Sequence, residues 1–277
     1  MSANPDAAAA IDAVGHTALG VARARAAESA RPDAVFDDPY AAAFDPGGFA
    51  ATEGRRRRDP AAVLRMYNWI VARTVFLDAL VATAGVDQIV VLGAGLDTRA
   101  LRLPLPETTV VYELDRQQLF DYKEPVLAGS AVAPQSRATR RPVVADLTED
   151  WQKTLCDSGF DPHRPSLWLA EGLLVYLDAA DAEAVLDGID RLSAPGSIAA
   201  FTTRNRDAPR SLPAADDTYA DVRRLWRSAV DVQARLGPLG WAIEVTDPGD
   251  VLREQGRGDA AAQIDPVRPP QLLVARR

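Results

Sequence analysis

Residues 88–98 read QIVVLGAGLDT, a short apolar run followed directly by a turn with two glycines. A short apolar run bounded by turn residues is typical of a β-strand. Gly93 and Gly95 carry no Cβ, so the backbone can turn tightly there and approach a ligand closely. The same order of predicted strand, turn and helix recurs along the rest of the chain, and this alternation determines the fold class.

Six further apolar runs are bounded by turn residues. They are TVVYEL (109–114), PVVA (142–145), SLWLA (166–170), SIAAFT (197–202), WAIEV (241–245) and QLLVA (271–275). The stretches 116–127, 148–158 and 179–193 are long enough to be the crossover helices that parallel pairing requires. The alternation predicts an α/β protein with a doubly wound, mainly parallel sheet of seven strands.

The part of the chain before this alternation has helical periodicity. One or two helices are expected within residues 6–30, and a long helix is expected to end near Gly85. We therefore divide the chain into an N-terminal helical cap (1–84) and a core (85–277). The core includes a helical insertion at about 205–240, with its helical part at 214–236. The run Arg55–Arg58 is expected to be a solvated loop, with a gate to the site as the alternative.

The composition excludes several classes of protein. The 277 residues are 47% hydrophobic and 25% charged, which is typical of a folded globular chain. A net charge of −8 disfavours nucleic acid and anionic membranes as partners and favours a small molecule. Cys156 is the single cysteine, so no internal disulfide can form, and no Cys/His cluster has zinc spacing. The acidic start and the absence of a long apolar run predict a cytoplasmic protein.

Acidic residues stand at the ends of successive predicted strands. Ligands of open parallel sheets collect beyond the carboxyl ends of the strands, so these residues are expected to share one crevice. Glu113 and Asp115 lie about 20 residues beyond the glycine turn, where either carboxylate could accept hydrogen bonds from ribose hydroxyls. Asp146 ends the third strand and Glu171 the fourth. Helix capping is the structural alternative for Asp115 and Asp146.

Several motifs occur in an order that carries a family resemblance. They are VVLGAGLDTRALRLP (90–104), VYELDRQQ (111–118), VVADL (143–147) and WLAEGLLVYL (168–177), preceded by ARTVFLD (72–78). With residues 17–41, they resemble the leucine carboxyl methyltransferase family, especially its actinobacterial branch of S-adenosylmethionine-dependent methyltransferases. The resemblance covers roughly residues 14–203 and implies a class I methyltransferase fold, with a Rossmann-like sheet and an N-terminal helical cap. Beyond about residue 205 the match is poor.

The resemblance also implies residue roles toward S-adenosylmethionine. At the methionine end, Arg73 would hold the carboxylate, Gly93 and Gly95 would lie beneath, and Glu171 would border the sulfonium. Asp97 is expected to serve the loop itself.

At the adenosine end, the resemblance assigns the ribose hydroxyls to Asp115. Asp146 would accept from the adenine amino group, and the Leu147 backbone would contact a ring nitrogen.

The chain holds few candidate bases. His163 precedes the fourth strand, at the end opposite the crevice, whereas His16 lies in the N-terminal segment that could fold over the site. Methylation of a carboxylate needs no base because that acceptor is already ionised. The resemblance implies a protein C-terminus or a small metabolite, such as a polyketide carboxylate, as the acceptor. We expect an O-methyltransferase that acts on a carboxylate of a small, polyketide-like metabolite of secondary metabolism. Tyr176 is expected to position the acceptor, although a packed core tyrosine is an equal alternative.

Other functions are considered beside this expectation. One is methylation of a hydroxyl with the help of a base, for which His16 is the candidate. A second is a nucleotide-dependent oxidoreductase, although Thr98 replaces the third glycine of the dinucleotide fingerprint. A third is a cofactor-binding module without turnover.

Overall fold

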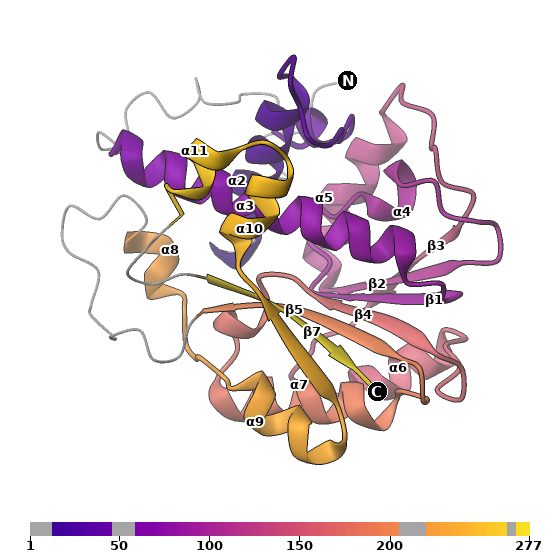
Figure 1. The fold of residues 1–277 in the computed structure, drawn as a ribbon. Coiled ribbons are helices and arrows are strands. Elements are labelled where there is room, and N and C mark those ends of the chain that lie inside the picture. Colours follow the sequence, from indigo (N-terminus) through magenta and orange to yellow (C-terminus); the bar gives the residue numbers. More distant parts are fainter. Residues whose placement is uncertain (1–12, 46–58, 205–219, 265–269) are drawn as a thin grey trace.

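The computed structural model describes residues 13–45, 59–204, 220–264 and 270–277. Within these residues, seven strands form one sheet in the order β3-β2-β1-β4-β5-β7-β6 (Figure 1). The strands are β1 (Gln88–Leu92), β2 (Val110–Asp115), β3 (Thr139–Val144), β4 (Ser166–Ala170), β5 (Ile198–Arg204), β6 (Ala242–Thr246) and β7 (Pro270–Arg276). Only β7 among them runs antiparallel to its neighbours β5 and β6. The predicted seven-stranded, mainly parallel sheet is thus confirmed.

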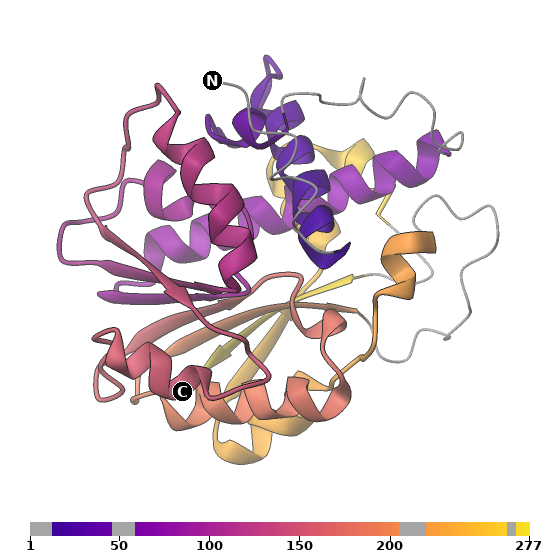
Figure 2. The same ribbon diagram turned by 180° about the vertical axis from the view of Figure 1, so that it is seen from behind.

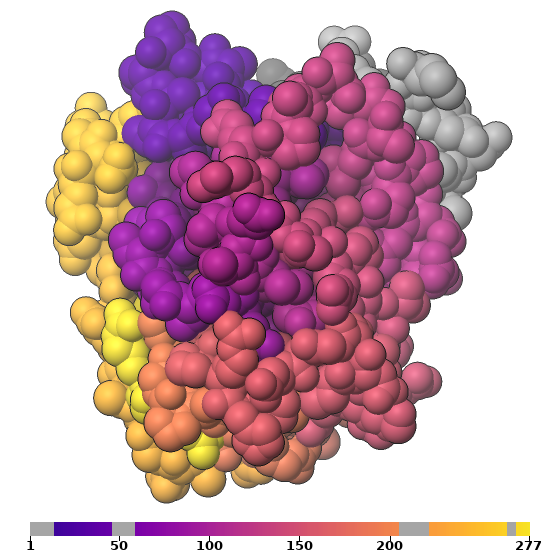
Figure 3. All heavy atoms as spheres, turned by 90° about the vertical axis from the view of Figure 1, so that its right-hand side faces the viewer, coloured from indigo at the N-terminus to yellow at the C-terminus, as the bar shows by residue number. Residues whose placement is uncertain are grey.

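Helices cover both faces of the sheet (Figure 1). One face carries α2 (Ala13–Ser29), α3 (Pro60–Thr83), α4 (Arg99–Arg102), α5 (Gln117–Ala128), α10 (Pro248–Glu254) and α11 (Gly258–Ala261). The other carries α6 (Trp151–Asp157), α7 (Ala179–Arg191) and α9 (Val232–Leu236), while α8 (Ala220–Arg224) lies beyond the end of β5. In the space-filling view of Figure 3, indigo N-terminal atoms lie at the top and the later, pink to orange atoms at the bottom.

The alternation of side chains along β1 builds two cores. Val90 and Leu92 pack into the larger cluster with α6, α7 and α9, whereas Ile89 and Val91 face α3 on the opposite side. Because both faces are buried, the strand has no polar alternation, which explains its continuous apolar sequence.

Helix α3 links the N-terminal region to the sheet. It begins at Pro60, with the Asp59 side chain accepting from the amides of Ala61 and Ala62, and Gly85 follows its end at φ +65°. Its middle packs on α10 and α11, and its last turns, with Leu77 and Val81, pack on the sheet. Figure 2 shows α2 crossing α3 on the same side of the molecule.

Several boundaries differ from the prediction. The third strand begins at Thr139 instead of residue 142, and the helix expected at 148–158 is confined to Trp151–Asp157 because Asp150 caps it. The helical insertion consists, where described, of two short helices, α8 and α9. The Arg55–Arg58 run and residues 205–219 lie outside the described residues. No helix among the described residues is long and apolar enough to cross a membrane.

Candidate functional site

The switch point of the sheet lies between β1 and β4, where the connections diverge to opposite sides. The loop after β1 turns through Gly93 and Gly95, whose φ angles are +61° and +50°. A Cβ on Gly93 would stand 2.9 Å from Leu173 Cδ1, and one on Gly95 would stand 3.6 Å from Ala18 Cβ. Leu173 therefore lies close to Gly93, and Ala18 of α2 lies close to Gly95.

The structure distinguishes the two acids at the end of β2. The Gly95 amide donates to Asp115 Oδ2 at 2.7 Å, so the Asp115 carboxylate lies against the glycine loop. Burial raises the pKa of Asp115, and the bonds from the Gly95 and Arg116 amides oppose that rise only in part. Glu113 is instead 1% exposed and is bonded to Lys123 at 2.6 Å and to Arg140 at 2.7 Å. Its carboxylate is thus already paired with two cationic side chains inside the protein.

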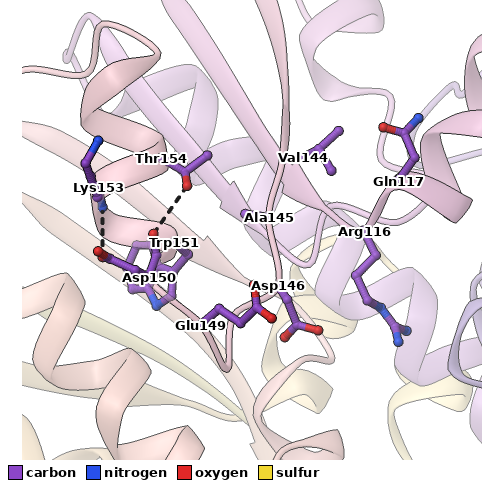
Figure 4. A pocket seen from close by; sticks show the side chains of 10 residues that line it. All are labelled: Arg116, Gln117, Val144, Ala145, Asp146, Glu149, Asp150, Trp151, Lys153 and Thr154. Carbon is purple, nitrogen blue, oxygen red and sulfur yellow. Dashed lines mark hydrogen bonds between the residues drawn. The ribbon is translucent and has the colours of Figure 1, made fainter.

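Asp146 lies beside a pocket of about 450 Å³ at the ends of β2 and β3 (Figure 4). Arg116 and Gln117 line it from the start of α5, directly after β2, and Val144 and Asp146 line it from the end of β3 and the loop that follows. Asp146 Oδ1 accepts from the Thr148 amide and hydroxyl at 2.9 and 2.7 Å, and these bonds lower the pKa of Asp146. Val144 is 48% exposed, so the pocket offers an apolar surface beside an ionised carboxylate. Leu147 is buried in the core next to this loop.

Arg73 and Glu171 meet at the end of β4. Arg73 Nε forms an ion pair with Glu171 Oε1 at 2.8 Å, and both side chains are about nine-tenths buried. No hydrogen bond from either terminal nitrogen of Arg73 is found among the described residues. A Cβ on Gly172, which has φ +61°, would stand 3.4 Å from Arg73 Nη1, so the adjacent glycine leaves space at the guanidinium. Burial lowers the pKa of Arg73, against the pull of Glu171, yet an arginine stays charged.

Behind this pair lies a cluster of charges that the sequence reasoning missed. Arg99 contacts Glu171 and Asp78, each at 2.8 Å, and also pairs with Asp97. Arg102 binds Asp78 through both terminal nitrogens at 2.7 Å. The available signal was the presence of charged side chains inside the motifs ARTVFLD and GAGLDTRA, which are otherwise apolar or small.

Thr98 also acquires a role. Its hydroxyl donates to Asp38 Oδ2 at 2.9 Å, and the same oxygen pairs with Arg25 of α2 at 2.8 Å. Arg25 also donates to the Leu96 carbonyl at 2.6 Å. The residue in place of the third fingerprint glycine therefore fastens the loop to the N-terminal region. Asp97 serves the loop as expected, since its Oδ1 accepts from the Arg99 amide at 2.7 Å.

The remaining predicted residues lie at different distances from these loops. Tyr176 is half-buried, and its hydroxyl lies 3.4 Å from Thr17 Oγ1 of α2. His16, next to Thr17, is exposed. His163 is also exposed and precedes β4, at the end of the sheet away from the glycine loop. Cys156 packs partly buried against the core, and burial raises the pKa of its thiol.

Comparison with known proteins places this site in a family. The model of the leucine carboxyl methyltransferase family matches residues 18–190. A protein of Mycolicibacterium paratuberculosis, named as an S-adenosyl-L-methionine-dependent methyltransferase, is 40% identical over 266 residues, covering 88% of each chain. One of the same name from Mycobacterium tuberculosis is 36% identical, over 95% of this chain and 94% of its own.

A solved structure of a methyltransferase from Thermobifida fusca YX shares the fold, with a TM-score of 0.54 and 17% identity over 92% of this chain and 94% of its own. The match to the family model covers the glycine loop, Arg73, Asp115, Asp146 and Glu171, the predicted site residues at the carboxyl ends of the strands and on α3. The chain therefore belongs to the leucine carboxyl methyltransferase family, among relatives that are named as S-adenosylmethionine-dependent methyltransferases.

Proposed function

We propose that this protein transfers a methyl group from S-adenosylmethionine to a carboxylate oxygen of a small metabolite. The methyl donor follows from membership of the family. The observation that carries the acceptor class is the absence, among the described residues, of a buried histidine at the glycine loop: His16 and His163 are both exposed. The family assignment leaves the oxidoreductase alternative without support.

The adenosine half of the cofactor fits the ends of β2 and β3. Asp115 would take the ribose hydroxyls, because its carboxylate already lies 2.7 Å from the Gly95 amide at the loop. Asp146 would accept from the adenine amino group, and the Leu147 backbone would contact a ring nitrogen. The exposed Val144 surface in the pocket of Figure 4 suits a flat ring beside these polar groups.

The methionine half fits the ends of β1 and β4. The terminal nitrogens of Arg73 would bind the carboxylate, because Glu171 contacts Arg73 at Nε and Gly172 leaves room beside Nη1. Gly93 and Gly95 would lie beneath this half of the cofactor. Glu171 would border it and hold Arg73 in place.

The cofactor supplies an electrophilic methyl group on a positively charged sulfur. The work of the protein in such a displacement is to align the acceptor oxygen and to exclude water. Helix α2, which packs over Gly95 through Ala18, is placed to close the site. Tyr176 would position the acceptor, since its hydroxyl lies near α2 at the end of the β4 loop.

A carboxylate is the acceptor that suits these residues. With an ordinary pKa near 4, it is ionised at neutral pH and needs no proton removed. The net charge of −8 makes a small acid a more suitable acceptor than a large anionic polymer. A polyketide-like acid of secondary metabolism belongs to this class. The alternative acceptor, a hydroxyl, would require a base at the site.

The chemical stability of the product separates the two acceptors. The protein is incubated with S-adenosylmethionine labelled in the methyl group and with the small-molecule fraction of an actinobacterial extract that passes an ultrafiltration membrane. A methyl ester releases volatile labelled methanol in mild alkali, whereas a methyl ether does not. We expect alkali-labile label with the native protein and less of it with Asp115→Ala when the cofactor is limiting. Alkali-stable label would assign the acceptor to a hydroxyl.

A further inference from the structure

We propose that Arg99 is a positioning residue that keeps Glu171 from occupying the Arg73 guanidinium, so that Arg73 can bind the carboxylate of the cofactor. The inference rests on the function proposed above and goes beyond it. Arg99 would never touch the ligand itself. It would act through one intermediate side chain, that of Glu171.

The contacts of Arg99 are unusually numerous. Its side chain is 3% exposed and meets three carboxylates, those of Asp78, Asp97 and Glu171. Burial disfavours the charged form of Arg99, but these carboxylates outweigh burial and raise its pKa well above the ordinary value. The guanidinium is therefore a fixed, fully charged group, held from α3 and from its own loop.

The division of the Glu171 oxygens is the central observation. Oε2 accepts a hydrogen bond from Arg99 Nη1 at 2.8 Å, and Oε1 contacts Arg73 Nε at 2.8 Å. A carboxylate with both oxygens available binds an arginine by a two-pronged fork. Because Arg99 occupies Oε2, Glu171 approaches Arg73 at its Nε, and the terminal nitrogens stay available.

The charges support the same conclusion. Burial raises the pKa of Glu171, but Arg99 and Arg73 outweigh burial and lower it, so the carboxylate is ionised. Without Arg99, this negative charge would face Arg73 alone. It would compete with the ligand carboxylate for the guanidinium and repel it at short range.

Two ligands separate this role from general support of the fold. S-adenosylhomocysteine carries the amino-acid carboxylate, whereas methylthioadenosine has the same nucleoside and lacks the amino-acid part. Both are titrated calorimetrically into the native protein and into Arg99→Lys, which keeps the charge but loses the planar fork. We expect Arg99→Lys to lower the affinity for S-adenosylhomocysteine by about tenfold or more and the affinity for methylthioadenosine by less than about twofold.

Arg102→Lys is the matched control. Arg102 lies on the same helix, is equally buried and binds Asp78, but makes no contact with Glu171 among the described residues. The substitution Arg102→Lys should lower the melting temperature and leave the ratio of the affinities for the two ligands unchanged. Adding Glu171→Gln to Arg99→Lys removes the competing charge, so the double variant should recover affinity for S-adenosylhomocysteine.

The outcomes are distinct. If the native protein binds neither ligand, the proposed function fails. If the native protein prefers S-adenosylhomocysteine but Arg99→Lys keeps that preference, or if the double variant recovers no affinity for S-adenosylhomocysteine, Arg99 has no positioning role.

If Arg99→Lys does not fold, Asp78→Asn takes its place, because Asp78→Asn loosens Arg99 and leaves the side chains of Glu171 and Arg73 intact. It should then reduce the preference, and an unchanged preference would overturn the proposal.

Discussion

The Gly95 amide donates a hydrogen bond to Asp115 Oδ2 at 2.7 Å, joining the loop after β1 to the end of β2. The bond favours the ionised form of a carboxylate whose pKa burial raises. One carboxylate thus has two tasks, to hold the glycine turn and to face a ligand. These tasks can be separated by substitution.

Asp115→Ala should weaken the binding of S-adenosylhomocysteine by about 1–3 kcal/mol, because buried ribose hydroxyls would lose their acceptor. Isothermal titration calorimetry measures this loss. Glu113→Gln serves as the control, since Glu113 is bonded to Lys123 and Arg140 within the protein. We expect it to lower the stability and to preserve the affinity. A larger loss of affinity in the control than in Asp115→Ala would transfer the ribose role to Glu113.

Arg73→Ala should abolish the preference for S-adenosylhomocysteine over methylthioadenosine, and Arg73→Lys should restore it only in part. A lysine offers a point charge in place of the planar group that matches a carboxylate. The comparison of the two ligands is again calorimetric. Equal weakening of both ligands by Arg73→Ala would show that Arg73 supports the loop and does not bind the amino-acid end.

The strands most faithfully predicted are those buried on both faces. The ranges 88–92 and 166–170 match β1 and β4, whose neighbours on either side and helices above and below favour apolar residues. Gln88 and Ser166, the first residue of each strand, are the polar exceptions. The edge strand β3 was predicted too short because it begins with polar residues. Arg140 and Arg141 extend it by binding Glu113 and stacking on Tyr112 of β2, contacts that no local pattern reveals.

For the candidate site too, the local pattern could be predicted from the sequence and the long-range contacts could not. Gly93, Asp115 and Asp146 could be predicted because strand ends converge on one edge of a parallel sheet. The choice between Glu113 and Asp115 from the residues alone remained open because both are acids at one strand end. The role of Arg99 was missed because its partners Asp78 and Glu171 lie 21 and 72 residues away.

Gly188→Ala should destabilise the protein even though alanine favours a helix. A Cβ at this position in α7 would stand 2.4 Å from Trp151 Cζ2, and Trp151 is 2% exposed. Overpacking costs about 1–3 kcal/mol, which exceeds the gain of about 1 kcal/mol in helix propensity. Gly20→Ala in α2 is the control, because no packing partner in the described part of the chain lies within 4 Å of its Cβ, and this substitution should stabilise the protein. Urea unfolding measures both, and a stabilised Gly188→Ala would contradict the packing.

Asp97 should make the stability of the folded protein depend on pH in the acidic range. Burial opposes its ionisation, but the charges of Arg99 and Lys123 and the hydrogen bond from the Arg99 amide together outweigh burial and lower the pKa of Asp97 to about 2, below the ordinary 3.8. Its ionised form is therefore favoured in the folded state, which contributes about 2 kcal/mol above pH ~4. That contribution is lost as the pH falls through about 2, where the folded protein also takes up the proton.

Asp97→Asn should therefore be less stable than the native protein at neutral pH, by about 2 kcal/mol or more. The difference should shrink as the pH falls from about 4 toward 2. Urea midpoints measured over this range test the prediction. A difference that stays constant down to pH ~2 would show that Asp97 contributes packing and not charge.

Methyl transfer itself should not need a base. His16 is exposed on α2, so His16→Ala should leave the rate of transfer to the acceptor found by the labelling experiment within about threefold of the native rate. The rate constant, measured in single turnovers with saturating cofactor, should also show no rise between roughly pH 6 and 9. An ionised carboxylate is ready for displacement once it is aligned, and alignment alone is worth up to about 7–11 kcal/mol. A loss of about a hundredfold in His16→Ala that still binds S-adenosylhomocysteine would identify a general base. The acceptor would then be a hydroxyl, whose proton must be removed before its oxygen can attack.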